Sequence, residues 1–528
     1  MNVGKVMGCC VAILFLSTTV AFAADKTTGD VKVESGMLHG VSDAGVVSYK
    51  GIPYAAPPTG NLRWKAPQPA AHWSGVRSAD QYGHDCMQLP FPSDAAPLGT
   101  KPDEDCLVLN VWAPAEPASS KLPVMVWIYG GGYVNGGSSP AVYDGSQFAK
   151  QGVVFVSFNY RVGRFGFFAH PALTAEAGSA PLGNYAFLDQ IAALKWVQHN
   201  IAAFGGDPGK VTLFGESAGG GSVLTMMTSP LSRGLFQQAI IESGGGRDGL
   251  GGMPRLSVAA NGKPSAESSG LAFAQSKGIA GSDAAALDAL RKLPADAIVD
   301  GLNMASMFQA AKTYSGPMID GKIVIETPQS AFLAGHQMKI PVMIGANSRD
   351  IGFSFAKSMQ EVVAPFGANK DRALAAYNPD NSTDARVVGT RVSADLIMVE
   401  PARFIAQEVA ASGQPAYHYR FSYVAASMRK EWDGAPHATE IPFVFDTVKA
   451  RYEAALDPAD EAIARTTNSY WASFAKTGDP NGADRPHWSP YARQTDIVMD
   501  FTNTGAVATP DPWKARLDLT EQLATAKP

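Results

Sequence analysis

The amino-acid sequence predicts an α/β protein built on a central, mostly parallel β-sheet that is flanked by helices. Apolar runs rich in Val, Ile and aromatic residues are typical of strands that are covered on both faces. Such runs lie at 122–130, 152–161, 210–217, 237–245 and 339–347. Helical or glycine-rich segments separate them, and this alternation predicts right-handed crossover connections between parallel strands.

Helical patterns occur between and after these runs. Residues 184–207 carry a broad apolar face at helical spacing, and a pair of glycines at the end is a stop signal. A second helix is expected at 466–478, which also ends in glycine. From 248 to 335 the pattern weakens, with a helical patch at 285–293. We interpret this segment as a helical insertion beside the sheet, without a core of its own, that caps a site.

Composition and charge exclude several classes of protein. Hydrophobic residues make up 46% of the chain and charged residues 17%, which is typical of a globular protein with a large core. The formal net charge is −5, and the sequence has no Lys/Arg cluster that could follow a phosphate backbone. We therefore expect no nucleic-acid partner.

The N-terminus has the pattern of a secretory signal peptide. Lys5 precedes an apolar stretch at 6–16, and Ala21-Phe22-Ala23 is a small-x-small cleavage signal. Because a bilayer span needs about 20 apolar residues, we favour a cleaved leader over a membrane anchor. We expect removal of residues 1–23 and no stable membrane insertion. The mature chain, 24–528, is then a single domain in the periplasm or outside the cell.

The cysteines are consistent with export. Cys9 and Cys10 lie in the predicted leader, so the mature chain keeps only Cys86 and Cys106. Exported proteins commonly join such a pair. We expect a disulfide here, worth roughly 3 kcal/mol on a chain-entropy estimate, with two buried free thiols as the alternative.

Ser217 is the candidate nucleophile. It lies between glycines in VTLFGESAGGG, residues 211–221. A Gly-x-Ser-x-Gly match alone is weak in a glycine-rich chain, but this one follows a predicted strand and opens onto a predicted helix. That setting is typical of a nucleophile elbow, where glycines leave room for a strained turn that exposes the hydroxyl.

A serine nucleophile needs a base, and the base needs an orienting acid. The histidines that follow the serine are His336, His418, His437 and His487. His437 lies in a small-residue loop from which an imidazole can reach the elbow, whereas His418 lies in a strand pattern and is interpreted as a packed or surface histidine. Asp350 follows the run at 339–347, at the sheet edge that carries the chemistry in parallel sheets.

The glycine triplet 130–132 is the candidate source of oxyanion hydrogen bonds. It directly follows the strand pattern at 122–130, where flexible backbone N–H groups can be aimed at a reacting carbonyl. Other glycine triplets occur at 219–221 and 244–246, so the position after an early core strand is what distinguishes this one.

Longer motifs surround these residues. They are FGGDPGKVTLFGESAGG (204–220), EDCLVLNVW (104–112), WIYGGGY, NYRVGRFGF, GNYAFLDQ and HATEIPFVF. The first two agree with the signatures of a known family, and the chain resembles the type B carboxylesterases, in the cholinesterase-like branch of the α/β-hydrolases, from about residue 36 to its last predicted helix. The resemblance implies an α/β-hydrolase fold with helical insertions that form a cap over the active site.

The resemblance also implies roles for individual residues. It implies a triad in which Ser217 is the nucleophile, His437 is general base and then acid, and Asp350 is the orienting acid. It implies that the oxyanion hole is formed by the N–H groups of Gly131, Gly132 and Ala218. It further implies the Cys86–Cys106 disulfide and a polar network near the triad, formed by Glu216, Ser243 and Glu440.

The chain departs from the family pattern at several positions. The family's acid is commonly Glu followed by Gly, whereas counting from Gly345 without a gap places Asp350 there. Because Asp is shorter than Glu, its loop must approach His437 more closely. Ala438 follows the base where Gly is usual, and Arg164 stands where an apolar residue or Pro is common.

The predicted function is hydrolysis of small-molecule carboxylic esters through an acyl-enzyme, without metal or cofactor. Related acyl chemistry on thioesters, lactones, carbamates or amides, or acyl transfer, is the alternative, and a non-catalytic binding module is a more distant one. Because the base must be neutral, the rate should decrease at pH values below the usual histidine pKa of about 6.5.

Two arginines near the predicted site bear on the substrate. Arg164 and Arg349 would suit an anionic ester, but we favour the interpretation that both are ordinary solvated arginines. The sequence leaves the physiological ester and the oligomeric state open.

Overall fold

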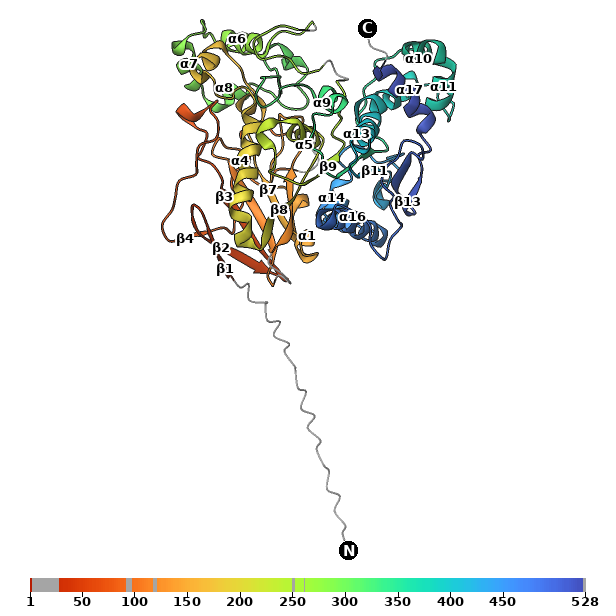
Figure 1. Cartoon of the computed structure of the whole chain (residues 1–528), viewed down its shortest axis with the longest axis horizontal. Helices are drawn as coiled ribbons and strands as arrows, with labels where there is room; N and C mark the ends of the chain where they lie inside the picture. The colour runs from red at the N-terminus through yellow and green to blue at the C-terminus, as the bar shows by residue number, and fades with distance from the viewer. Residues whose placement is uncertain (2–27, 92–96, 117–120, 249–251, 261, 526–528) are drawn as a thin grey trace.

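A computed structural model describes Met1 and residues 28–91, 97–116, 121–248, 252–260 and 262–525. Its centre is a 13-stranded sheet in the order β1-β2-β3-β5-β7-β6-β8-β9-β10-β11-β12-β13, with β4 paired to β2 (Figure 1). The strands are β1 (Thr28–Val33), β2 (Gly36–Asp43), β3 (Val46–Pro53), β4 (Val76–Ser78), β5 (Val108–Pro114), β6 (Leu122–Ile128), β7 (Val154–Phe158), β8 (Gly206–Glu216), β9 (Gln238–Glu242), β10 (Val342–Asn347), β11 (Ala416–Phe421), β12 (Ile497–Thr502) and β13 (Gly505–Pro510).

The middle of the sheet is parallel, from β7 through β6, β8, β9, β10 and β11 to β12. The N-terminal strands β1, β2, β3 and β5 pair antiparallel at one edge, as β12 and β13 do at the other. The predicted runs contain β6, β7, β9 and β10 and overlap most of β8, which begins earlier, at Gly206. All residues of β7 and β10 are buried. The predicted α/β fold with a mostly parallel sheet is confirmed.

Helices flank the sheet in groups. Helices α5 and α13 pack on β9, β10 and their neighbours, while α1 and α16 pack on the strands around β6 and β7. The helices are α1 (Ser146–Lys150), α2 (Gly163–Gly166), α3 (Pro171–Ala177), α4 (Tyr185–Asn200), α5 (Ala218–Thr228), α6 (Ala266–Ser276), α7 (Ala284–Arg291), α8 (Ala295–Val299), α9 (Pro328–Ala334), α10 (Met359–Val363), α11 (Lys370–Tyr377), α12 (Ala385–Ala394), α13 (Glu400–Ala411), α14 (Ile441–Val444), α15 (Val448–Tyr452), α16 (Pro458–Thr477) and α17 (Lys514–Thr525).

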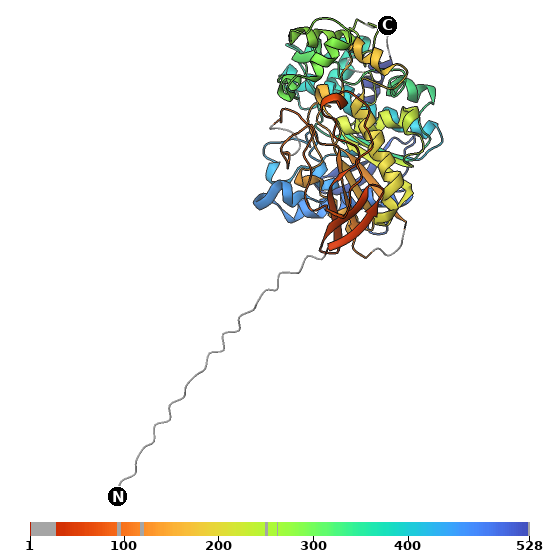
Figure 2. The same ribbon diagram turned by 90° about the vertical axis from the view of Figure 1, so that its left-hand side faces the viewer.

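The segment 248–335 carries helices α6 to α9, which gather above the sheet in both views (Figures 1 and 2). Its apolar side chains Phe273, Leu287 and Leu290 join the hydrophobic cluster that also contains the central strands. Helices α10 to α12 differ, because their buried side chains form a separate cluster with Leu519 of α17. The sequence analysis did not anticipate this second cluster.

Three observations concern the prediction that the protein is exported. Cys86 and Cys106 are bonded, as predicted, and both are buried. Within the described ranges, no helix combines the length and the apolar character needed to cross a bilayer. Apart from Met1, the predicted signal peptide lies outside the described residues.

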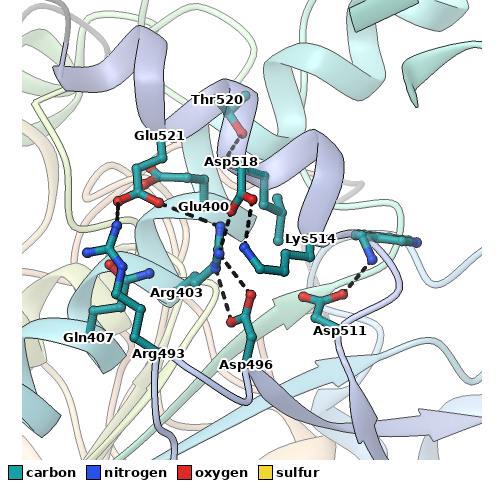
Figure 3. A network of polar contacts seen from close by, with 12 residues as sticks. Glu400, Arg403, Gln407, Arg493, Asp496, Asp511, Lys514, Asp518, Thr520 and Glu521 are labelled. Atoms are coloured by element: carbon teal, nitrogen blue, oxygen red, sulfur yellow. Dashed lines mark hydrogen bonds and ion pairs between the residues drawn. The ribbon is translucent and has the colours of Figure 1, made fainter. Parts of the chain in front are cut away.

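A buried charge network holds the C-terminal helix on the body of the protein (Figure 3). The Arg403 side chain, on α13, is only 2% exposed, and its Nη2 lies 2.8 Å from Oδ2 of Asp496 and 2.7 Å from Oδ1 of Asp518 on α17. Glu521, one turn along α17, pairs with the exposed Arg493 at 2.7 Å. Arg403 therefore connects α13, α17 and the turn before β12.

We predict that Arg403→Met destabilises the protein far more than Arg493→Gln. Removing Arg403 leaves the buried Asp496 without its main partner, which typically costs about 3–5 kcal/mol. The matched change at Arg493 breaks a surface pair, which is worth less than about 1 kcal/mol. Thermal unfolding of the variants measures the difference, and equal melting temperatures would contradict a stabilising role for this network.

Candidate active site

Ser217 occupies a strained turn between β8 and α5. Its φ and ψ are 56° and −121°, in the left-handed half of the backbone map that non-glycine residues rarely adopt. A Cβ on Gly219 would lie 2.0 Å from the carbonyl oxygen of Ile128, and one on Gly215 would lie 2.6 Å from the same atom. Only glycine therefore fits on either side of the motif, because the turn packs directly against the end of β6.

The candidate base and acid are in direct contact. Nδ1 of His437 lies 2.6 Å from Oδ1 of Asp350, which follows β10 by three residues. Oδ2 of Asp350 accepts hydrogen bonds from the Ser243 hydroxyl at 2.6 Å and the Asn347 N–H at 2.9 Å. The structure thus brings Asp350, and not the next residue Ile351, to the imidazole, as counting from Gly345 predicts.

Ser217 and His437 line one cavity of about 280 Å³. Gly130, Gly131 and Glu216 line it as well, so the predicted nucleophile, base and glycine segment share one space. The lining also includes Met304, from the segment between α8 and α9, which belongs to the insertion that the sequence analysis expected to cap a site.

The glycine segment after β6, the candidate oxyanion hole, adopts backbone conformations that favour glycine. Gly131 and Gly132 have φ values of 99° and 62°, and a Cβ on Gly131 would lie 2.4 Å from the Asn135 carbonyl oxygen. Ala218 is the first residue of α5, and the N–H groups of a helix's first turn have no partner within the helix. A Cβ on Gly130 would lie 3.0 Å from the Ser217 Cβ, so this segment passes directly beside the serine.

The three residues predicted to form a polar network lie close to the candidate base and acid or to their neighbours. Oε1 of Glu216 lies 3.1 Å from Nε2 of His437, on the ring nitrogen opposite to the one that Asp350 contacts. Ser243 binds Asp350 directly, as described above. Glu440 accepts a hydrogen bond from the side-chain amide of Asn347, so its link to the triad passes through that residue.

The acidic surroundings determine the charge of His437. Burial lowers the pKa of its imidazole, but the charges of Glu216 and Asp350 and the hydrogen bond from Nδ1 outweigh burial and raise this pKa to about 10. Burial has the opposite effect on the Asp350 carboxyl and raises its pKa. The charge of His437 and the hydrogen bonds from His437, Ser243 and Asn347 outweigh burial and bring the pKa of Asp350 below its usual value. The pair is therefore a carboxylate beside an imidazole that holds its proton strongly.

Ala438 explains why glycine is usual after the base. Its φ is 64°, a left-handed conformation that costs a non-glycine residue of the order of 1–3 kcal/mol. The chain accepts this strain directly beside His437, so the histidine loop has the same backbone path that a glycine would give it.

Sequence reasoning missed two buried polar residues of the site. Asn347 ends β10 and was treated only as part of a strand, and Glu242 ends β9 in register with Glu216. The Trp471 indole donates a hydrogen bond of 2.7 Å to Glu242. Both residues could have been found in the sequence as polar or charged residues near the end of an apolar run. The carboxyl ends of parallel strands meet at the sheet edge where active sites lie.

The structure assigns structural partners to both arginines considered for anionic substrates. The guanidinium of Arg164 is buried and donates to the carbonyl oxygens of Val299 at 2.8 Å and Thr313 at 3.1 Å. It therefore binds the insertion rather than the cavity, and the expectation that Arg164 is solvated was wrong, because backbone carbonyls of the insertion replace water around its guanidinium. Arg349 pairs with Asp433 at 2.6 Å. In the part of the chain that the structure describes, no group of three or more His, Cys, Asp or Glu side chains is arranged to hold a metal ion.

The fold and this constellation define the α/β-hydrolase class. The chain matches the Carboxylesterase family over residues 27–384 and 368–518, and it belongs to that family. It is 37% identical over 490 residues to para-nitrobenzyl esterase of Bacillus subtilis (strain 168), covering 89% of this chain and 94% of that protein. It is 34% identical over 523 residues to fumonisin B1 esterase of Sphingopyxis macrogoltabida, covering 94% and 91%.

Further relatives agree. Human cocaine esterase is 32% identical over 523 residues, covering 90% of this chain and 87% of that protein. A solved structure of PNB esterase superposes with a TM-score of 0.78 and 32% identity, covering 94% of this chain and 99% of the other. The protein is therefore a carboxylic ester hydrolase of the serine hydrolase type with the α/β-hydrolase fold.

We predict that Glu216→Gln lowers the pKa of His437. The substitution removes a negative charge 3.1 Å from Nε2, and a nearby negative charge is what favours the protonated ring. The NMR titration of the His437 ring proton measures the shift. Glu326→Gln, beside the exposed His336, is the control and should leave His437 unchanged. An unchanged pKa of His437 in Glu216→Gln would show that its charge is set elsewhere.

Proposed function

We propose that the protein hydrolyses carboxylic esters through a Ser217–His437–Asp350 triad and an acyl-enzyme. The Ser217 hydroxyl attacks the ester carbonyl while His437 accepts its proton. The developing oxyanion receives hydrogen bonds from the backbone N–H groups of Gly131, Gly132 and Ala218. The alcohol leaves with the proton from His437, and water activated by His437 then releases the acid.

One observation carries this proposal. The imidazole of His437 is held by Asp350 at 2.6 Å and lines the same cavity as Ser217, which sits in the strained turn of a nucleophile elbow. Such strain is found where a side chain must be presented to a substrate. The same carboxylates that raise the pKa of His437 also stabilise the imidazolium that forms when the serine loses its proton.

The substrate proposal is a small-molecule ester. The related proteins are named for their action on para-nitrobenzyl esters, fumonisin B1 and cocaine, so the family accommodates esters of very different size. In this chain, apolar side chains such as Met304 and Trp432 line the cavity beside Ser217. These walls favour apolar acyl or alcohol groups. The same triad performs thioester, lactone, carbamate or amide hydrolysis and acyl transfer, which remain alternative reactions of this site.

We also propose that the enzyme acts outside the cytoplasm. The leader pattern at 1–23 and the Cys86–Cys106 disulfide both favour an oxidising compartment, either the periplasm or the extracellular medium. The mature single-domain enzyme is then 24–528.

Replacing Ser217 with Ala should abolish hydrolysis of p-nitrophenyl acetate and butyrate. Loss of the nucleophile typically lowers kcat on the order of 10⁴- to 10⁶-fold. The release of p-nitrophenol measures the rate. Ser276→Ala, on the exposed end of α6, is the matched control and should keep full activity. A folded Ser217→Ala variant as fast as the wild type would rule out the proposed nucleophile.

The rate should depend on pH through His437. Because the pKa of His437 is raised, its neutral form becomes abundant only at higher pH. We therefore expect kcat/KM to rise with pH, and the midpoint of this rise to lie above the usual histidine pKa of about 6.5. A pH–rate profile of p-nitrophenyl butyrate hydrolysis measures this midpoint. Full activity maintained down to pH values near 4 would be incompatible with His437 as the base.

A further inference from the structure

The acid and the base of the triad lie on loops that are far apart in sequence but bonded to each other. The N–H of Arg349 donates to the Ala435 carbonyl at 2.9 Å, and the N–H of Ala435 donates to the Ser348 hydroxyl at 3.0 Å. The side-chain amide of Asn347 donates to the Pro436 carbonyl at 2.7 Å. We call these contacts of residues 347–349 with 435–436 the loop clamp.

Asn347 is the centre of the loop clamp. It is fully buried, its backbone N–H donates to Oδ2 of Asp350, and its side chain donates to the carbonyl directly before His437 and to Glu440. One residue therefore contacts the acid, the peptide that carries the base, and a carboxylate of the surrounding network. A buried amide with such charged and peptide partners is held firmly, because each lost bond leaves a buried group unpaired.

The loop clamp lies where an aspartate, with its short side chain, has to reach the histidine. Aspartate lacks one methylene of the family's usual glutamate, so its loop must lie closer to the histidine. The Asp350 side chain is fully buried, and its carboxyl contacts Nδ1 of His437 at 2.6 Å. The clamp is the set of bonds that holds the loop of the acid against the loop of the base while this contact is made.

We propose that the loop clamp sets the acid-to-base separation for an aspartate and that Asn347 is a positioning residue for His437. This inference rests on the proposed triad. It assigns a role in the reaction to a residue that contacts neither the substrate nor the reacting atoms, and it predicts that this active site rejects the family's own usual acid.

The first test replaces Asp350 with Glu. With the clamp intact, the extra methylene pushes the carboxylate or the imidazole out of place, and a displacement of about 1 Å lowers kcat by about 100-fold. In the double variant Asp350→Glu/Asn347→Ala the loosened loops accommodate the longer acid, so it should be more active than Asp350→Glu alone. A double variant whose losses simply multiply, or an Asp350→Glu variant with wild-type kcat, would overturn the inference.

The second test replaces Asn347 with Asp, which keeps the shape but turns an amide donor into a carboxylate facing Glu440 and a carbonyl. We expect kcat to fall by about 10- to 100-fold with KM nearly unchanged, because the base is displaced while the cavity walls stay in place. The added negative charge should also move the acid limb of the pH–rate profile to higher pH. Wild-type kcat and pH profile would contradict a positioning role.

Two further variants keep the test decisive. Ser348→Ala removes only one clamp bond and should lower kcat by about three- to tenfold at constant KM even if Asn347→Asp does not fold; unchanged kcat would count against the clamp. Asp433→Asn breaks only the exposed pair with Arg349, whose partners are 31% and 64% exposed, and should keep wild-type activity. If Ser217→Ala remains active, the proposed function itself fails. If Ser217→Ala is inactive but the loop-clamp variants keep wild-type activity, only this inference is overturned.

Discussion

The close packing of the turn after β8 against the end of β6 is the constraint on which the site depends. Gly219 lies against the Ile128 carbonyl with no room for a side chain, α5 starts directly after the serine, and Ser217 has a left-handed conformation. Three features meet at this turn. Ser217 lines the cavity, the first residue of α5 follows it directly, and Oε1 of Glu216 lies 3.1 Å from Nε2 of His437. The proposed nucleophile, one proposed oxyanion donor and a carboxyl group beside the proposed base thus lie on the same turn, whose strain is supported by the parallel strands beneath it.

The buried carboxyl groups around His437 would repel one another if all were ionised. Their different surroundings give these carboxyl groups different pKa values. Asp350 accepts several hydrogen bonds and faces the imidazole, so it stays ionised at a low pKa. Burial, together with the charge of Asp350, raises the pKa of Glu440 to about 7, and burial with neighbouring carboxylates raises the pKa of Glu242 well above its usual value. A raised pKa favours the neutral form of both outer carboxyls, and the neutral form of Glu440 would remove one of the charges that raise the pKa of His437.

The sequence could predict the parts of the site that local chemistry specifies. Ser217 and its glycines form one continuous motif, the central strands are continuous apolar runs, and Asp350 could be located by counting from Gly345. The remainder depends on contacts between distant segments. Asn347 is an ordinary polar residue until Pro436, many residues later, is placed against it, and nothing local reveals that Arg164 reaches the insertion instead of a substrate. The cluster formed by α10 to α12 with α17 escaped for the same reason, since its core is completed by Leu519 near the C-terminus.

The insertion shows how this fold separates specificity from catalysis. Arg164, on the short helix α2 after β7, holds the insertion at Val299 and Thr313, on both sides of the stretch that contains Met304. The N–H of Met304 donates to the Asn135 side chain at 2.9 Å, and Asn135 follows the oxyanion glycines. A cavity wall tied at both ends and in its middle is already in place before a substrate arrives. Its side chains can differ without disturbing the turn at Ser217 or the loops of Asp350 and His437, because most of its anchors are backbone carbonyl and N–H groups, the Thr313 hydroxyl bonded to Arg164 being a side-chain anchor. The wall of the cavity can therefore change independently of the proposed triad, which is one physical reason why relatives in this family carry names as unlike as para-nitrobenzyl esterase and cocaine esterase.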